Sequence, residues 1–369
     1  MDRKIFFLLF LIGLLSFSFL LTADVNEGVE DYYRARVISV ENVEQDSDFI
    51  TLEQNAKVVL LNGPHEGTVV EVNNLFVNDR VYTNIYLEEG TEVIIAAYGQ
   101  DGETNFYLQD ISRDRGLLYL AIVFVVLILL IGLKQGFKTL ITLAITAFVI
   151  FKGMIPLLLA GYSPIPVASI AAVLIIVVIL VIIGGINYKS LAAIIGTSSG
   201  VIIAGLLAYY IGDISHLTGL GSDEAQMLLT GDIQVDIRGL LFAGIIIGSL
   251  GAITAVGMSI ASSAEQIKEA NPEMGFSALS EAALKVGRDI MGTMSNTLIL
   301  AYVGGSIHLL LLIQVYEVNW LRIINMDMIA TEVVRGLAGS IGLIISIPIT
   351  AVIAGYLMSK KEIALSDRI

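Results

Sequence analysis

Cysteine is absent from the 369-residue chain, and histidine occurs only three times. Without cysteine there is no disulfide, no thiol nucleophile, no cysteine-ligated zinc and no iron–sulfur cluster. Three histidines argue against a histidine-rich metal centre. We therefore expect no metal site and no cofactor.

Charged residues are also scarce, at 15% of the chain, whereas soluble domains carry about 25%. Hydrophobic residues make up 56%, and the mean hydropathy is +0.81. A soluble protein of this size cannot bury that much apolar surface. The composition predicts an integral membrane protein, with the lipid bilayer as its first partner.

The net charge of −14 is concentrated in one segment. Residues 24–115 carry 19 acidic and 6 basic side chains, whereas the rest of the chain carries 16 and 15. The acidic segment must therefore lie in water. Because nucleic-acid binding requires a basic surface, a nucleic-acid partner is excluded.

The first 115 residues read as a leader followed by a small β domain. Residues 1–23 hold an apolar run from Ile5 to Leu21, which fits either a removed signal peptide or an uncleaved anchor. Residues 24–115 show alternating apolar stretches separated by turn sequences such as Asn62-Gly63-Pro64. We infer an extracytoplasmic all-β domain, OB-like in type.

Residues 116–358 predict an α-helical polytopic membrane bundle, and residues 359–369 a cytoplasmic tail. A span needs about 20 apolar residues. Pro348 predicts a kink or break in the last span. About seven spans fit, at 116–133, 137–160, 164–186, 190–212, 238–262, 289–314 and 328–358.

Lysine and arginine predict the orientation of these spans, because cytoplasmic loops carry an excess of both. With the β domain outside the cell membrane, the outer loops hold only Arg238 and Arg322. The inner sites hold nine: Lys134, Lys138, Lys189, Lys268, Lys285, Arg288, Lys360, Lys361 and Arg368. Within the inner loop 263–288, residues Phe276–Val286 fit a short helix on the membrane surface or a plain connector.

Glycine pairs at G-x3-G spacing occur at Gly196/Gly200 and Gly244/Gly248. They fit either a tightly packed bundle, which also allows a homo-oligomer, or sliding faces in a transporter. Gly196–Gly200 matches a nucleophile-elbow pattern as well, but it lies inside a predicted membrane helix rather than a strand–turn–helix. With no catalytic constellation visible, we expect no enzyme activity.

Polar and ionisable side chains within the predicted spans form two layers, and such groups are functional candidates by default. Glu332 and Arg335 are spaced to pair on one helix, and Lys152, deep in its span, predicts an internal partner such as Glu332. The candidate transport-path residues are Lys152, Ser259, Ser262, Arg288, Asp289, Thr293, Asn296, Thr297, Glu332 and Arg335.

The C-terminal third resembles a known family. Residues 285–302 read KVGRDIMGTMSNTLILAY, and they are accompanied by EQIKEANP at 265–272 and ATEVVRGLAGSIGLIISIPIT at 330–350. These blocks are similar to the YibE/F-like membrane proteins. The resemblance covers roughly residues 116–358 and implies a prokaryotic multi-span membrane protein, without implying an activity.

Two hypotheses for function follow. The first is a transporter or channel for an ion or small solute, with a cation favoured because the acidic segment concentrates cations near its mouth. The second is a membrane-anchored accessory, receptor or sensor protein whose β domain binds a partner.

Overall fold

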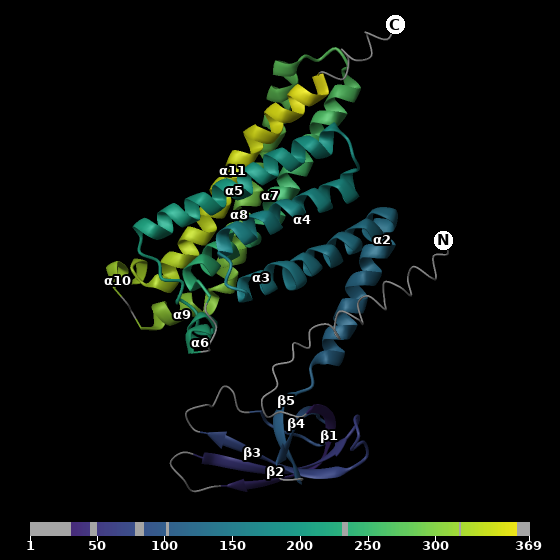
Figure 1. Ribbon diagram of the computed structural model, residues 1–369, viewed down its shortest axis with the longest axis vertical. Coiled ribbons are helices and arrows are strands. Elements are labelled where there is room, and N and C mark those ends of the chain that lie inside the picture. Colours follow the sequence, from purple (N-terminus) through teal and green to yellow (C-terminus); the bar gives the residue numbers. More distant parts are fainter. Residues whose placement is uncertain are drawn as a thin grey trace. The chain divides into compact units, whose positions relative to one another are not determined.

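The computed structural model describes residues 31–44, 50–77, 85–100, 103–230, 235–316 and 319–359 (Figure 1). The predicted leader over residues 1–23 and the tail beyond Ser359 lie outside these ranges. The chain divides into two compact units, Met1–Phe124 and Val125–Ile369, and each is described by itself.

The first unit contains a five-stranded antiparallel sheet with the strand order β3-β2-β1-β4-β5. Strands β3 and β5 at the two edges also contact each other, so the sheet is barrel-like. Alternate residues of each strand, such as Ala35 and Val37, are buried in its core. The predicted small β domain is confirmed. Its strands are β1 (Asp31–Glu44), β2 (Ile50–Leu60), β3 (Val69–Val77), β4 (Glu92–Gln100) and β5 (Glu103–Ile111).

A fully buried amide, Gln54, holds the segment that precedes β4. Its Oε1 accepts hydrogen bonds from the backbone N–H of Leu87 at 2.9 Å and from Asn74 Nδ2 at 3.1 Å. Its Nε2 donates to Asn42 Oδ1 at 2.9 Å and to the Leu87 carbonyl at 3.3 Å. The network is thus a satisfied polar core, which specifies one position for this segment.

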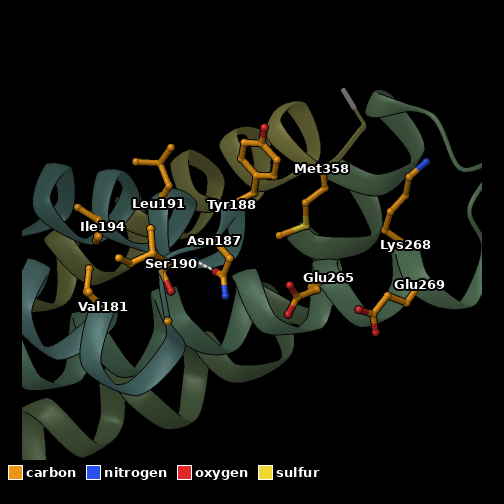
Figure 2. Close-up of a pocket in the computed structure, with 12 residues that line it drawn as sticks. Val181, Asn187, Tyr188, Ser190, Leu191, Ile194, Glu265, Lys268, Glu269 and Met358 are labelled. Atoms are coloured by element: carbon orange, nitrogen blue, oxygen red, sulfur yellow. Dashed lines mark hydrogen bonds between the residues drawn. The ribbon is translucent and has the colours of Figure 1, made fainter. Parts of the chain in front are cut away.

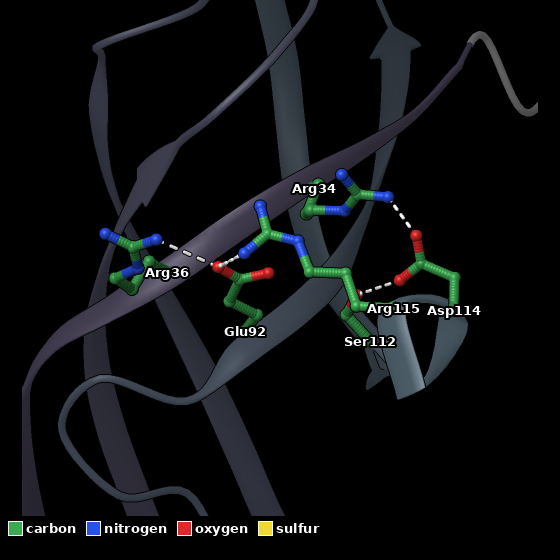
Figure 3. A network of polar contacts seen from close by, with 6 residues as sticks. All are labelled: Arg34, Arg36, Glu92, Ser112, Asp114 and Arg115. Atoms are coloured by element: carbon green, nitrogen blue, oxygen red, sulfur yellow. Dashed lines mark hydrogen bonds and ion pairs between the residues drawn. The ribbon is translucent and has the colours of Figure 1, made fainter. Parts of the chain in front are cut away.

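An ion-pair network joins the sheet to the first apolar helix, α2 (Asp114–Phe148) (Figure 3). Glu92 of β4 accepts from Arg36 of β1 at 2.9 Å and from Arg115 of α2 at 2.7 Å. Arg34 of β1 pairs with Asp114 at the start of the same helix. The first turn of α2 is therefore fixed to two strands.

The second unit is built on three helices that pack closely, α5 (Tyr188–Ile214), α7 (Ile237–Ala270) and α11 (Asp327–Ser359) (Figure 1). A Cβ at Gly200 would lie 2.7 Å from the carbonyl oxygen of Gly342, so the α5 and α11 backbones are nearly in contact. Close packing is thus observed at Gly196/Gly200, and sliding of these faces stays a prediction. Gly244, by contrast, has open space at its Cβ position.

Helices α4 (Pro164–Gly184) and α8 (Phe276–Gly305) pack against this core, α4 on α5 and α7, and α8 on α7 and α11. Local sequence sets the helix ends. Asn187 accepts a hydrogen bond from the Ser190 N–H at 2.9 Å to cap α5. The shorter helices are η2 (Val149–Met154, a π-helix), α3 (Ile155–Leu159), α6 (Asp223–Thr230), α9 (Ile307–Val315) and α10 (Trp320–Ile324).

Two local predictions are wrong. Residues Phe276–Val286 form neither a separate surface helix nor a plain connector, because they are the first turns of α8, packed through Phe276 on Tyr356. Of the kink or break predicted at Pro348, the break is absent, since α11 is one helix. The hydroxyls of Ser346 and Thr350 bond to carbonyls nearby, as helices that tolerate proline in membranes do.

Five helical segments are long and apolar enough to cross a membrane, or six if the bent pair α8–α9 counts as one span. The protein is therefore membrane-embedded. The first segment, Asp114–Leu159, has 46 residues and contains a non-helical residue, Leu133, at φ 46° and ψ −121°. The span predicted at 116–133 falls within it, and so does the span predicted at 137–160 except for its last residue.

We expect Gln54→Leu to raise the hydrogen-exchange rate of the Leu87 amide roughly fivefold, equivalent to about 1 kcal/mol, because that N–H loses its acceptor. Exchange mass spectrometry on the detergent-solubilised chain measures it. Lys57→Leu, on the exposed side of the same strand, is the matched control and should leave exchange at Leu87 unchanged. Equal exchange in both variants would contradict the role given to Gln54.

Candidate functional site

The candidate site lies where α8 breaks into α9 beside α11. The two helices α8 and α9 meet at Ser306 with a bend of 62°. A cavity of about 250 Å³ opens at this bend. Its lining is mostly apolar, and the groups in it that carry chemistry are Tyr302, Ser306 and Glu332.

An ion pair on α11 borders this cavity. Arg335 Nη1 donates to Glu332 Oε1 at 2.8 Å, and the two side chains are 30% and 26% exposed. The predicted pairing at i,i+3 is what the structure shows. The Arg335 guanidinium also lies 5.9 Å from the centre of the Tyr302 ring, a cation–π contact between α11 and α8.

We call Tyr302, Glu332 and Arg335 the cluster. Two of its polar atoms are buried and lack a hydrogen-bond partner among the described residues. They are the Tyr302 hydroxyl and Arg335 Nε. The hydroxyl lies against Gly248 of α7, where an added Cβ would be 2.8 Å away. Since a buried unsatisfied group is costly, these atoms are suited to contact a ligand or a bound water.

The depth of the cluster follows from helix contacts. Gly200, Ile253 and Gly342 meet near the middle of α5, α7 and α11, which defines the mid-height of the bundle. Glu332 and Arg335 precede Gly342 by ten and seven residues, or about 15 and 10 Å along α11. Because half the hydrocarbon core is about 15 Å, Arg335 falls within that depth and Glu332 at its edge.

The candidate residues on α8 lie together on one face of the helix. We call Asp289, Gly292, Thr293 and Asn296, flanked by Arg288 and Thr297, the α8 polar stripe. All six are exposed. The threonine hydroxyls bond to carbonyls of their own helix, Thr293 to Ile290 at 2.9 Å and Thr297 to Thr293 at 2.8 Å.

The remaining predicted site residues lie elsewhere. Ser259 and Ser262 line a separate groove of about 540 Å³ between α4 and α7. Lys152 is exposed on the π-helix η2, which packs near α4. The carboxylate of Glu332 is bonded to Arg335, and the suggested Lys152–Glu332 pair stays a prediction. The structure therefore brings together only some of the candidates.

A larger pocket, about 610 Å³, lies among the ends of α4, α5, α7 and α11 (Figure 2). Beside it, Lys189 and Glu265 form an ion pair at 2.7 Å, which ties α5 to α7. Lys268 donates to the carbonyls of Pro272 and Met274 and so closes the turn after α7. In the sequence, these lysines indicated only the orientation of the spans. The sequence features that could have indicated this pocket are the Asn187 cap and the EQIKEANP block.

Tyr302, which ends the block NTLILAY, was not predicted as a site residue. A lone tyrosine in a span is usually an interfacial anchor, so its burial could be found only from the structure. Among the residues described, no three His, Asp or Glu side chains gather in a metal-binding cluster.

A family model described as YibE/F-like protein matches residues 120–360. The match covers more than half of the chain, which therefore belongs to the YibE/F-like family. No curated protein and no solved structure shows significant similarity to the chain. The family match includes the α8–α9 break, the Glu332–Arg335 pair and the α8 polar stripe.

We expect Arg335→Gln to lower the apparent Tm of the detergent-solubilised protein, because it leaves the Glu332 carboxylate unpaired at the edge of the hydrocarbon core, at a cost of about 1–3 kcal/mol. The double variant Glu332→Gln/Arg335→Gln should recover part of that loss. Intrinsic fluorescence during heating measures it, with Arg322→Gln on α10 as a control for an exposed arginine. Additive losses in the double variant would show that the pair is not coupled.

Proposed function

We propose that this member of the YibE/F-like family is a transporter or channel for an ion or small solute, and not an enzyme. The observation that carries the proposal is the helix break at Ser306 beside the Glu332–Arg335 pair. Transporters commonly place solute sites where a discontinuous membrane helix meets ionisable groups. The cavity at the break is the proposed point of engagement.

The polar chemistry at this cavity supports a solute site. A structural ion pair would need only Glu332 and Arg335, whereas Tyr302 brings a third polar group into the same place with its hydroxyl unused. The cavity, at about 250 Å³, has room for a small solute or a partly hydrated ion. We favour a cation, because the segment 24–115 carries 19 acidic against 6 basic residues.

We further propose seven spans, with Asp114–Leu159 crossing twice. At 1.5 Å per residue its 46 residues would extend about 69 Å as one helix, more than twice the hydrocarbon thickness. Leu133 is the residue where the helix geometry is broken. Counting α8–α9 as one broken span completes the seven. The excess of lysine and arginine at the predicted inner sites supports a cell-membrane protein with the β domain outside and the C-terminus inside.

The accessory, receptor or sensor hypothesis has one observation in its favour. The network around Glu92 and Asp114 fixes the first turn of α2 to strands β1 and β4 (Figure 3), so a change in the β domain would be passed to the helix. Deleting residues 24–115 separates the two hypotheses. Retained solute flux favours the transporter, and lost function with intact insertion favours the sensor.

We expect an ion or metabolite of the transported class to raise the apparent Tm of the purified protein, and Tyr302→Phe to reduce this shift because it removes one hydroxyl from the site. A ligand at 100 times its Kd adds about 2.7 kcal/mol of stability. The exposed Tyr209→Phe is the matched control. A panel of monovalent and divalent cations and small metabolites is tested first.

Flux of each stabilising solute is then measured in proteoliposomes of the wild type, Tyr302→Phe, Glu332→Gln and Arg335→Gln. Flux that is the same in all four proteins would exclude the cavity as the path. A broad panel without any stabilising solute would overturn the transporter proposal in favour of the partner-binding one.

A further inference from the structure

The α8 polar stripe faces away from its own bundle at the depth where a membrane protein normally presents aliphatic side chains. Leu298 packs on Gly339 and Ser249, close to mid-height, and Gly287 packs on Ile347 and Ile260 lower in the bundle. Asn296 lies between these two levels, so its exposed carboxamide is near mid-height. Other outer faces carry exposed aliphatic side chains instead: Ile202 and Leu206 on α5, and Leu337 and Ile341 on α11.

Several groups in the stripe are unsatisfied. The Asn296 carboxamide makes no hydrogen bond to another residue in the described part of the chain, and neither Arg288 nor Asp289 forms an ion pair there. Arg288 and Asp289 cannot neutralise each other well, because neighbours at i,i+1 do not face each other on a helix. Charged groups at this depth almost always face protein or a water-filled cavity, since hydrocarbon is costly for them.

We propose that a second copy of this chain covers the α8 polar stripe with its own stripe. Around a twofold axis along the membrane normal, two α8 helices run parallel and residues of equal height meet. Asn296 then meets Asn296 of the other copy, and each carboxamide has both a donor and an acceptor to offer. Arg288 of one copy lies beside Asp289 of the other, so the surface is complementary in charge to itself.

Gly292 allows the two α8 helices to approach each other closely. It lies between Asp289 and Asn296 on the stripe, and a Cβ built there meets no atom within 4 Å. Small residues let membrane helices approach so that polar side chains bond across the interface. In this proposal, the homo-oligomer predicted from the sequence forms through the α8 polar stripe.

The first part of α2, another exposed helix in the described part of the chain, has the wrong chemistry for this surface. Residues 117–131 of α2 read LLYLAIVFVVLILLI and are largely exposed, but their sole polar atom is a tyrosine hydroxyl. Such a helix cannot satisfy a carboxamide, a carboxylate and a guanidinium at once. The stripe itself can, because it contains all three groups.

The absence of native cysteine makes the test direct. Asn296→Cys and Ile202→Cys are made in the full chain, expressed in membranes and oxidised with copper phenanthroline. Ile202 is the matched control, being exposed near mid-height on α5. We expect a disulfide-linked dimer from Asn296→Cys at least about tenfold more abundant than from Ile202→Cys.

A water-soluble maleimide distinguishes the other occupants. Labelling of uncross-linked Asn296→Cys would show a water-filled face, and neither labelling nor cross-linking would show a lipid face or a different protein partner. Either outcome overturns the proposal. Solute flux is not read in this experiment, so its failure leaves the cavity at Ser306 untouched.

Charge reversal tests the register within the interface. In the Asn296→Cys background, Arg288→Asp places four carboxylates at one level of the dimer, and the cross-linked fraction should fall roughly tenfold. The exchange Arg288→Asp/Asp289→Arg restores two opposite pairs and should restore the cross-link. Failure of the exchange to do better than the single variant would overturn the Arg288–Asp289 contact.

Discussion

The structure depends on one constraint, that hydrocarbon offers no hydrogen bonds to a polar group. Helices satisfy their own backbones, so the bundle is free to pack α5, α7 and α11 through glycine until Gly200 and Gly342 nearly touch. Every polar side chain placed on this framework must then find its partner in the protein. Hydroxyl groups find a partner on their own helix, because they can donate to a backbone carbonyl one turn earlier. Thr197, Ser346 and Thr350 do this.

Polar side chains that find no hydrogen-bond partner on their own helix indicate where the protein contacts something else. Tyr302 and Arg335 keep unused polar atoms near the break at Ser306, where Tyr302 and Glu332 line a small cavity. Asn296 and Asp289 keep theirs on the outward side of the same helix. Helix α8 thus carries unsatisfied groups on both faces, which explains why it is less apolar than its neighbours and passes as a span only together with α9.

Much of the architecture could be predicted from the sequence. Long apolar runs predicted the helices, alternation predicted the β strands, and the spacing of Glu332 and Arg335 predicted their pair. A kink or break was predicted at Pro348, because proline is a usual cause, whereas the observed break lies in a different span, at Ser306 after Gly304-Gly305. Glycine and serine neighbours are another known cause of kinks, and this one was not used in the prediction. The face of α8 that is buried also escaped prediction, because both faces carry polar residues and only the contacts of Leu298 and Gly287 decide between them.

The short connection between the sheet and α2 has a consequence for anything that the β domain binds. Strand β5 ends at Ile111 and α2 begins at Asp114, with the Glu92 network fixing the first turn. Only Ser112 and Arg113 separate the last strand from the apolar helix, so a molecule bound by the β domain would be held within a short length of chain from that helix. Confinement of this kind raises effective concentration without any gain in affinity. A weakly binding β domain would then be sufficient.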